Sequence, residues 1–138
     1  MELGEDIAQI LATSKTIAVV GLSDKPDRLS NQIAAYLKQH GYRIIPVNPT
    51  ITAALGETAY PNLRDIPERV DVVQIFRKPD DVLPVVDDAI AIGAKVVWMQ
   101  PGIVNEEAAA RAKAAGLKVL MDICMRATHR TLQASGRI

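Results

Sequence analysis

Short runs of β-branched residues alternate along the chain with longer runs rich in alanine and leucine. A continuously apolar run that ends at a glycine or a polar residue is typical of a strand buried on both faces of a parallel sheet. Such runs predict strands at residues 16–22, 43–47, 70–76, 95–99 and 118–121, with a weaker candidate at residues 58–60.

The stretches between these strands carry helix signals. Ser30 has a hydroxyl that can cap free N–H groups, and Asn105 precedes two glutamates whose charge suits the positive end of a helix dipole. Pro84 is tolerated in a first helical turn. The expected helices are residues 5–12, 30–40, 83–92, 106–115 and 126–132, followed by a frayed tail at residues 133–138.

Strands that alternate with helices at this spacing indicate βαβ units. Right-handed crossovers then give a doubly wound parallel sheet, an α/β fold of the Rossmann-like class with three α/β/α layers. With residues 58–60 as a strand the expected order is 3-2-1-4-5-6, and without them it is flavodoxin-like. Either order opens a ligand crevice beyond the C-terminal strand ends, at residues 21–28, 48–49, 76–79 and 100–102.

Composition narrows the classes of protein that fit. The length of 138 residues predicts a single domain spanning residues 1–138, with a core at about 5–132. Sixteen basic residues balance sixteen acidic ones, whereas a general nucleic-acid binder needs a net basic face. A single cysteine, an acidic N-terminus and apolar runs far shorter than the ~20 residues of a membrane span predict a cytoplasmic protein without a membrane partner.

The loop after the first strand, residues 21–28, is the first candidate for chemistry. A dinucleotide fingerprint needs glycines at its first, third and sixth positions, whereas only Gly21 matches, and no acidic residue follows the second strand to hold a ribose. The loop still suits a phosphate, because it leads into a helix N-terminus and carries Ser23, Lys25 and Arg28. The alternative is a solvated loop whose charges alternate in sign.

Two further strand exits carry side chains that suit a nucleotide. Phe76 or the Arg77 plane can cover an adenine, and Arg77 or Lys78 can hold a phosphate. The alternative is an inward Phe76 with its neighbouring cations in water. Gln100 and Gly102 form the other exit, where the glycine permits close backbone approach to a ligand or simply makes a tight turn.

No set of side chains suggests catalysis or metal binding. Cys124 is the only thiol, and His129 follows five residues later, which places it on another face of the expected helix. A lone cysteine is usually a small buried hydrophobe. No group of His, Cys, Asp and Glu has metal-ligand spacing. We therefore expect neither catalytic residues nor a metal site.

The order and spacing of several segments carry a resemblance to a known family. These segments are residues 16–23, 45–49, 70–73, 76–79, 89–95 and 100–103. Together they resemble the small stand-alone CoA-binding proteins, a family similar to the N-terminal domain of the succinyl-CoA synthetase α subunit. The resemblance covers nearly the whole chain.

The resemblance implies a Rossmann-like domain that holds coenzyme A, or an acyl-CoA, through its ADP portion. It assigns the phosphates to the loop with Gly21, Leu22, Ser23, Lys25 and Arg28, the nucleotide border to Asn48 and Pro49, the adenine end to Phe76, Arg77 and Pro79, and the opposite wall to Gln100 and Gly102. Thr50 stands where family members often carry a basic residue, which weakens the phosphate contact expected there.

The same resemblance favours binding over catalysis. The synthetase carries a phosphorylated histidine in a second domain, and neither His40 nor His129 lies in a matching motif. We therefore expect a module that binds CoA or acyl-CoA without catalysis, as a monomer or weak homodimer, and has no nucleic-acid partner. Two alternatives stay open: an NAD(P)-binding domain of the oxidoreductase type, and a regulatory interaction domain that has lost its nucleotide.

Overall fold

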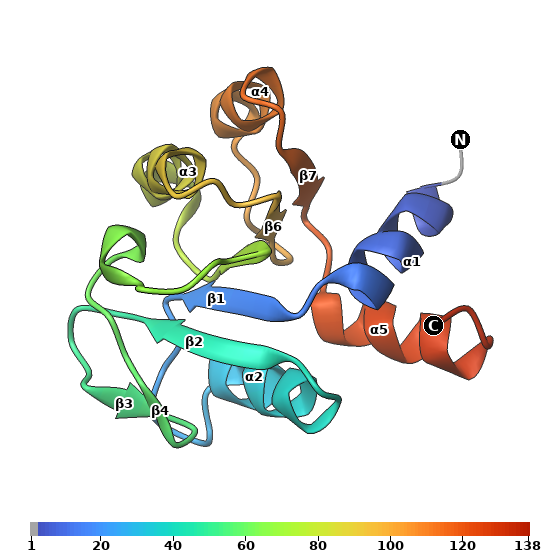
Figure 1. Ribbon diagram of the computed structural model, residues 1–138, viewed down its shortest axis with the longest axis horizontal. Helices are drawn as coiled ribbons and strands as arrows, with labels where there is room; N and C mark the ends of the chain where they lie inside the picture. The colour runs from blue at the N-terminus through green and yellow to red at the C-terminus, as the bar shows by residue number, and fades with distance from the viewer. Residues whose placement is uncertain (1–2) are drawn as a thin grey trace.

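A five-stranded parallel sheet forms the centre of the molecule in the computed structural model, which describes the backbone of residues 3–138 and side chains from residue 6 onward (Figure 1). The strand order is β2-β1-β5-β6-β7. The strands are β1 (Thr16–Val20), β2 (Arg43–Val47), β5 (Val72–Ile75), β6 (Val96–Met99) and β7 (Lys118–Met121). This confirms the α/β, Rossmann-like class, and it confirms the flavodoxin-like order of the two that the sequence allowed.

Helices cover both faces of this sheet, which buries its apolar strands from both sides. One face packs against α1 (Leu3–Thr13), α2 (Leu29–Gln39) and α5 (Met125–Ala134), and the other packs against α3 (Val82–Ala91) and α4 (Glu106–Ala114). Figure 1 shows the two layers on opposite sides of the strands. Among the helices of residues 3–138, none combines the length and apolar content that a membrane crossing requires.

The weak strand candidate does not join the main sheet as a full strand. Its first part lies in β4 (Glu57–Thr58), which pairs antiparallel with β3 (Ala53–Ala54). Tyr60 then makes a single parallel bridge with Val47 of β2. The Tyr60 N–H donates to the Pro46 carbonyl at 3.0 Å and the Tyr60 carbonyl accepts from the Asn48 N–H at 2.9 Å, and the pairing goes no further. The six-stranded order therefore fails for lack of one continuous segment.

Two predictions about helix ends need correction. The α2 helix begins at Leu29 with Arg28 at its N-cap and no side-chain cap, and the Ser30 hydroxyl instead accepts a hydrogen bond from the Ser23 N–H at 3.0 Å. The expected frayed tail is wrong in part, because α5 continues to Ala134 and Ile138 packs against the core. In contrast, Asn105 caps α4 as predicted, accepting from the Ala108 N–H at 2.9 Å.

Candidate functional site

The strand exits named above meet at the C-terminal edge of the sheet. The chain leaves β1 for α2 on one face and leaves β5, through the short 3-10 helix η2 (Pro79–Asp81), for α3 on the other face. Because β1 and β5 are neighbours, the connections diverge between them. This is the switch point at which open α/β sheets bind ligands.

Gly21 holds the exits of β1 and β5 together. Its φ of +90° lies in the left-handed region, and a Cβ built on it would overlap the Phe76 carbonyl oxygen. Its N–H donates to the Val47 carbonyl at 2.8 Å, and the Phe76 N–H donates to the Val20 carbonyl at 2.8 Å. The position therefore requires glycine for packing within the sheet, whether or not a phosphate approaches it.

The loop that follows is braced by Ser23. Its N–H donates to Ser30 Oγ at 3.0 Å, its carbonyl accepts from Asn31 Nδ2 at 2.9 Å, and its Oγ accepts from the Lys25 N–H at 3.1 Å. Since that Oγ acts as an acceptor, its own proton stays available for an anion. Leu22, by contrast, is fully buried in the core, so the structure leaves only its backbone to take part in a site.

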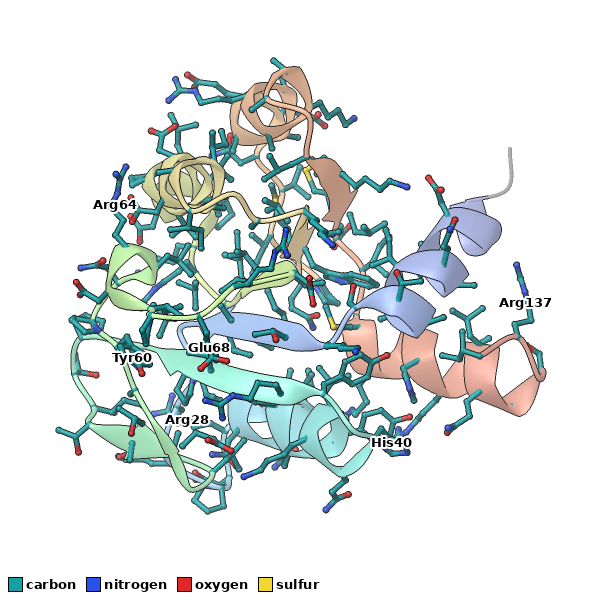
Figure 2. All side chains as sticks on the ribbon, in the orientation of Figure 1. Arg28, His40, Tyr60, Arg64, Glu68 and Arg137 are labelled. Carbon is teal, nitrogen blue, oxygen red and sulfur yellow. The ribbon has the colours of Figure 1, made fainter. Side chains whose placement is uncertain are left out.

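The N-terminus of α2 offers free N–H groups that no side chain of the helix caps. It has no side-chain cap and no acidic residue in its first turn. Lys25 and Arg28 are exposed beside it, and Figure 2 shows Arg28 at this end of α2 and His40 at the other. Asp24 and Asp27 are also exposed in this loop and balance the two cations. The free N–H groups and the helix dipole favour an anion here.

The side chain of Asn48 stabilises the loop after β2 through hydrogen bonds within the protein. Its Nδ2 donates to the Leu22 carbonyl at 3.0 Å, and its Oδ1 accepts from both the N–H and the hydroxyl of Thr50, at 3.0 and 2.8 Å. Thr50 thus completes the turn instead of offering a cation. Pro49 lies beyond this turn and lines a pocket.

That pocket, here named the α3-side pocket, has a volume of about 160 Å³. Its walls are mostly apolar, and they are formed by Val20, Val47, Pro49, Pro61, Asn62, Leu63, Arg77, Val85 and Asp88. Asp88 accepts from Arg64 Nε at 2.7 Å, and Figure 2 shows Arg64 at the turn next to α3. Arg77 is half-buried and, within the described side chains, makes no salt bridge.

A second pocket, here named the α2-side pocket, has a volume of about 220 Å³. It is lined by Leu29, Ile33, Phe76, Gln100, Pro101, Ile103, Cys124 and Arg126. Phe76 and Arg77 therefore line different pockets, because successive residues of an extended strand point to opposite faces of the sheet. That both flank the adenine end stays a prediction, for which the structure offers two separate pockets.

Pro79 and Gly102, like the predicted residues of the 21–28 loop and Asn48, line neither of these two pockets. Pro79 begins η2, and its carbonyl accepts from Asn105 Nδ2 at 2.8 Å. Gly102 has a φ of +82°, and its N–H donates to Asp122 Oδ1 at 2.7 Å. Both residues are exposed. Their observed contacts are those of turn residues.

Two residues that the sequence prediction lacks as binding residues, Cys124 and Arg126, line the α2-side pocket. Both follow the exit of β7. The exits of parallel strands meet at one edge of the sheet, so the position of these residues after the last strand is the signal that points to them.

The doubly wound sheet and the pockets at its switch point define a Rossmann-like ligand-binding domain. The particular family follows from comparison with known proteins. The chain belongs to the CoA binding domain family, which matches residues 15–130. Membership in this family supports an association with CoA.

Its relatives include small proteins and parts of larger enzymes. The uncharacterized protein YneT of Bacillus subtilis is 44% identical over 124 residues, which cover 90% of this chain and 92% of YneT. A hypothetical protein from Pyrococcus horikoshii is 44% identical, with a TM-score of 0.92 over 94% of this chain and 92% of that chain. The dinucleotide-forming acetyl-coenzyme A synthetase 1 of Ca. Korarchaeum cryptofilum is 33% identical, with a TM-score of 0.69 over 79% of this chain and 26% of that protein.

Proposed function

We propose that this protein binds CoA or an acyl-CoA through its ADP portion, without catalysis of its own. The observation that carries the proposal is the arrangement at the switch point. A pocket lies on each side of the exits of β1 and β5, and the uncapped N-terminus of α2 lies beside them. A long ligand with an aromatic end, a diphosphate and a flexible arm matches this arrangement.

The α3-side pocket suits the adenosine end of the ligand. An adenine needs apolar walls with a few polar groups, which Val20, Val47 and Val85 provide together with Asn62. CoA differs from NAD by a phosphate on its ribose, and a buried anion needs a cation. Arg77 is the cation that lines this pocket, and its planar fork suits a phosphate. We therefore assign Arg77 to the 3′-phosphate.

Calorimetric titration of CoA and 3′-dephospho-CoA tests this assignment. A charge-assisted hydrogen bond contributes ~1.5–3 kcal/mol, so Arg77→Ala should weaken CoA binding by roughly tenfold to a hundredfold. Binding of 3′-dephospho-CoA should hardly change, because it has no phosphate to lose. Arg69→Ala, an exposed arginine that lines neither pocket, is the matched control and should bind both ligands like the unsubstituted protein.

Two results would contradict the proposal in different ways. Equal losses for both ligands in Arg77→Ala would mean that Arg77 serves the adenine or the diphosphate, so that the cation for the 3′-phosphate should be sought at Lys25, Arg28 or Lys78. If the protein clearly bound NAD and did not bind CoA, CoA would be rejected as the ligand. The alternative of an NAD(P)-binding domain would then be supported.

The absence of catalysis rests on the surroundings of the single thiol. Cys124 needs a nearby base to act as a nucleophile. The Nδ1 of His129 is instead 2.8 Å from the Tyr36 hydroxyl, and its ring is buried between α2 and α5. Incubation with acetyl-CoA should therefore release no free thiol. Hydrolysis that disappears in Cys124→Ala would show that the protein is an enzyme.

A further inference from the structure

The α2-side pocket contains a buried donor without a partner. Gln100 is 2% exposed, and its Oε1 accepts from the Met125 N–H at 3.0 Å and from Gln74 Nε2 at 3.1 Å. Among the described residues, nothing accepts from its Nε2. An unsatisfied buried amide is costly, and native proteins seldom keep one unless a ligand or water completes it.

The orientation of this amide follows from its neighbours. If the Gln100 amide were turned over, its NH₂ group would face the Met125 N–H and the Gln74 NH₂, and donors would meet donors. The observed orientation is therefore the one that satisfies Met125. Gln100 lines the pocket. Within the described part of the chain, its NH₂ group is enclosed and lacks a partner, as does the Oε1 of the neighbouring Gln74.

Positive charge gathers around the same pocket. Arg126 is half-buried, lines the pocket and, within the described side chains, has no salt bridge. It lies in the first turn of α5, which has no side-chain cap and no acidic residue there. No aspartate or glutamate of the described residues lines the pocket. The polar part of an occupant should therefore be an anionic acceptor.

The rest of the pocket is apolar. Leu29 stands at its rim with 59% of its surface exposed, and Ile33 and Ile103 form its wall. Apolar walls with a cation and an amide donor match a short carbon chain that ends in a carboxylate. A phosphate alone would leave the apolar walls without a partner.

We propose that the α2-side pocket binds the carboxylate end of a short acyl chain, held by Arg126 and Gln100. The chain can come from an acyl-CoA with an acidic acyl group, and this form rests on the proposed function. It can also come from a free short carboxylic acid. In both cases the carboxylate accepts from the guanidinium and from the free amide, while the methylenes contact Leu29 and Ile103.

Acyl-CoA pairs of equal length test the charge. Succinyl-CoA and butyryl-CoA both carry four carbons, and only the first ends in a carboxylate. Calorimetric titration should show that succinyl-CoA binds at least about tenfold more tightly, and Arg126→Gln should abolish this preference while leaving butyryl-CoA unchanged. Arg130→Gln removes the same charge one turn later, where Arg130 lies 5.1 Å from the Tyr36 ring centroid, and should keep the preference.

Either of two outcomes overturns the proposal. Equal affinity of the unsubstituted protein for succinyl-CoA and butyryl-CoA would show that the pocket does not take a carboxylate. An equal loss of CoA, butyryl-CoA and succinyl-CoA in Arg126→Gln would show that Arg126 holds the diphosphate. Gln100→Glu, which keeps the acceptor for Met125 and replaces the free donor, should likewise remove the preference if the variant folds.

Alkylation of Cys124 tests the pocket without CoA. Cys124 is the only cysteine, and it lines the pocket. Its rates of alkylation by iodoacetate and by iodoacetamide therefore compare how readily an anionic and a neutral reagent reach the pocket. The ratio of the two rates cancels effects on the thiol itself. Arg126→Gln should lower the iodoacetate-to-iodoacetamide ratio by about tenfold, and Arg130→Gln should not.

The two experiments separate this inference from the proposed function. If Arg126→Gln lowers the iodoacetate-to-iodoacetamide ratio but the protein binds no CoA, the pocket is a site for free short carboxylic acids. In that case the proposed CoA binding is wrong. A ratio that is unchanged by Arg126→Gln, in a protein that binds CoA without preferring succinyl-CoA, overturns the carboxylate pocket alone.

Discussion

Gly21 and Gly116 adopt nearly the same backbone angle in very different surroundings. Their φ values are +90° and +91°. A Cβ at Gly21 would overlap the Phe76 carbonyl, whereas a Cβ at Gly116 would meet no atom within 4 Å. The pair separates the cost of a left-handed backbone from the cost of a steric clash.

We expect Gly21→Ala to destabilise the protein more than Gly116→Ala. A left-handed residue with a side chain costs roughly 1–2 kcal/mol, and this applies to both variants. At Gly21 the carbonyl of β5 must also move, which adds about 1–3 kcal/mol, as overpacking in a core does. Urea unfolding of both variants measures the difference. Equal losses would show that the exits of β1 and β5 separate easily.

At the level of the helices, α2 and α5 contact each other through the buried side chain of His129. His129 is 4% exposed, and its Nδ1 lies 2.8 Å from the Tyr36 hydroxyl oxygen. The His40 and His129 ring centroids are 4.9 Å apart, and Tyr42 lies at 5.8 Å from the same ring. Burial, and then the charge of His40, lower the pKa of His129 below its ordinary value. The contact between the helices therefore favours the neutral form of the His129 ring.

Acid should weaken this helix contact. Because the folded pKa of His129 is lowered, the unfolded chain takes up the proton first as the pH falls below about 6.5, and stability is lost from there down to the folded pKa. Urea unfolding at pH 7.5 and 5.5 should show a drop that His129→Phe reduces. His40→Asn, which alters an exposed ring, should keep most of the drop. An equal drop in His129→Phe would assign it to other groups.

Local signals made the elements predictable. Each predicted strand and helix lies within two residues of its observed bounds, because apolar runs and terminal glycines are properties of short segments. The hydroxyl of Ser30 was misassigned because two partners compete for it, and the competing Ser23 N–H lies in a loop whose path depends on the sheet. The pairing of Tyr60 likewise depends on where β2 lies.

For the candidate site, the sequence predicts its location at one edge of the sheet but not its detailed shape. Parallel strands bring their exits together, so Pro49, Arg77 and Gln100 could be selected without coordinates. Their division into two pockets could not, because it depends on which face each side chain takes at the strand end. Arg126 follows the exit of the last strand and could be selected by the same rule, but the pocket that it lines depends on how α5 packs against the sheet.

A ligand that spans both pockets should protect both from hydrogen exchange, and this is the prediction for the whole molecule. CoA should slow amide exchange at residues 62–64 of the α3-side pocket, at the phosphate loop 21–31 and at residues 124–128 of the α2-side pocket, because its nucleotide, diphosphate and arm occupy these three places. ADP should slow exchange at residues 62–64 and 21–31 but not at residues 124–128, since it lacks the arm. The groove at the other end of the sheet, which includes Gln9 and Gly93, serves as an internal control and should not change. Identical protection by CoA and ADP would mean that the arm does not enter the α2-side pocket, and protection at the control groove would place the ligand elsewhere.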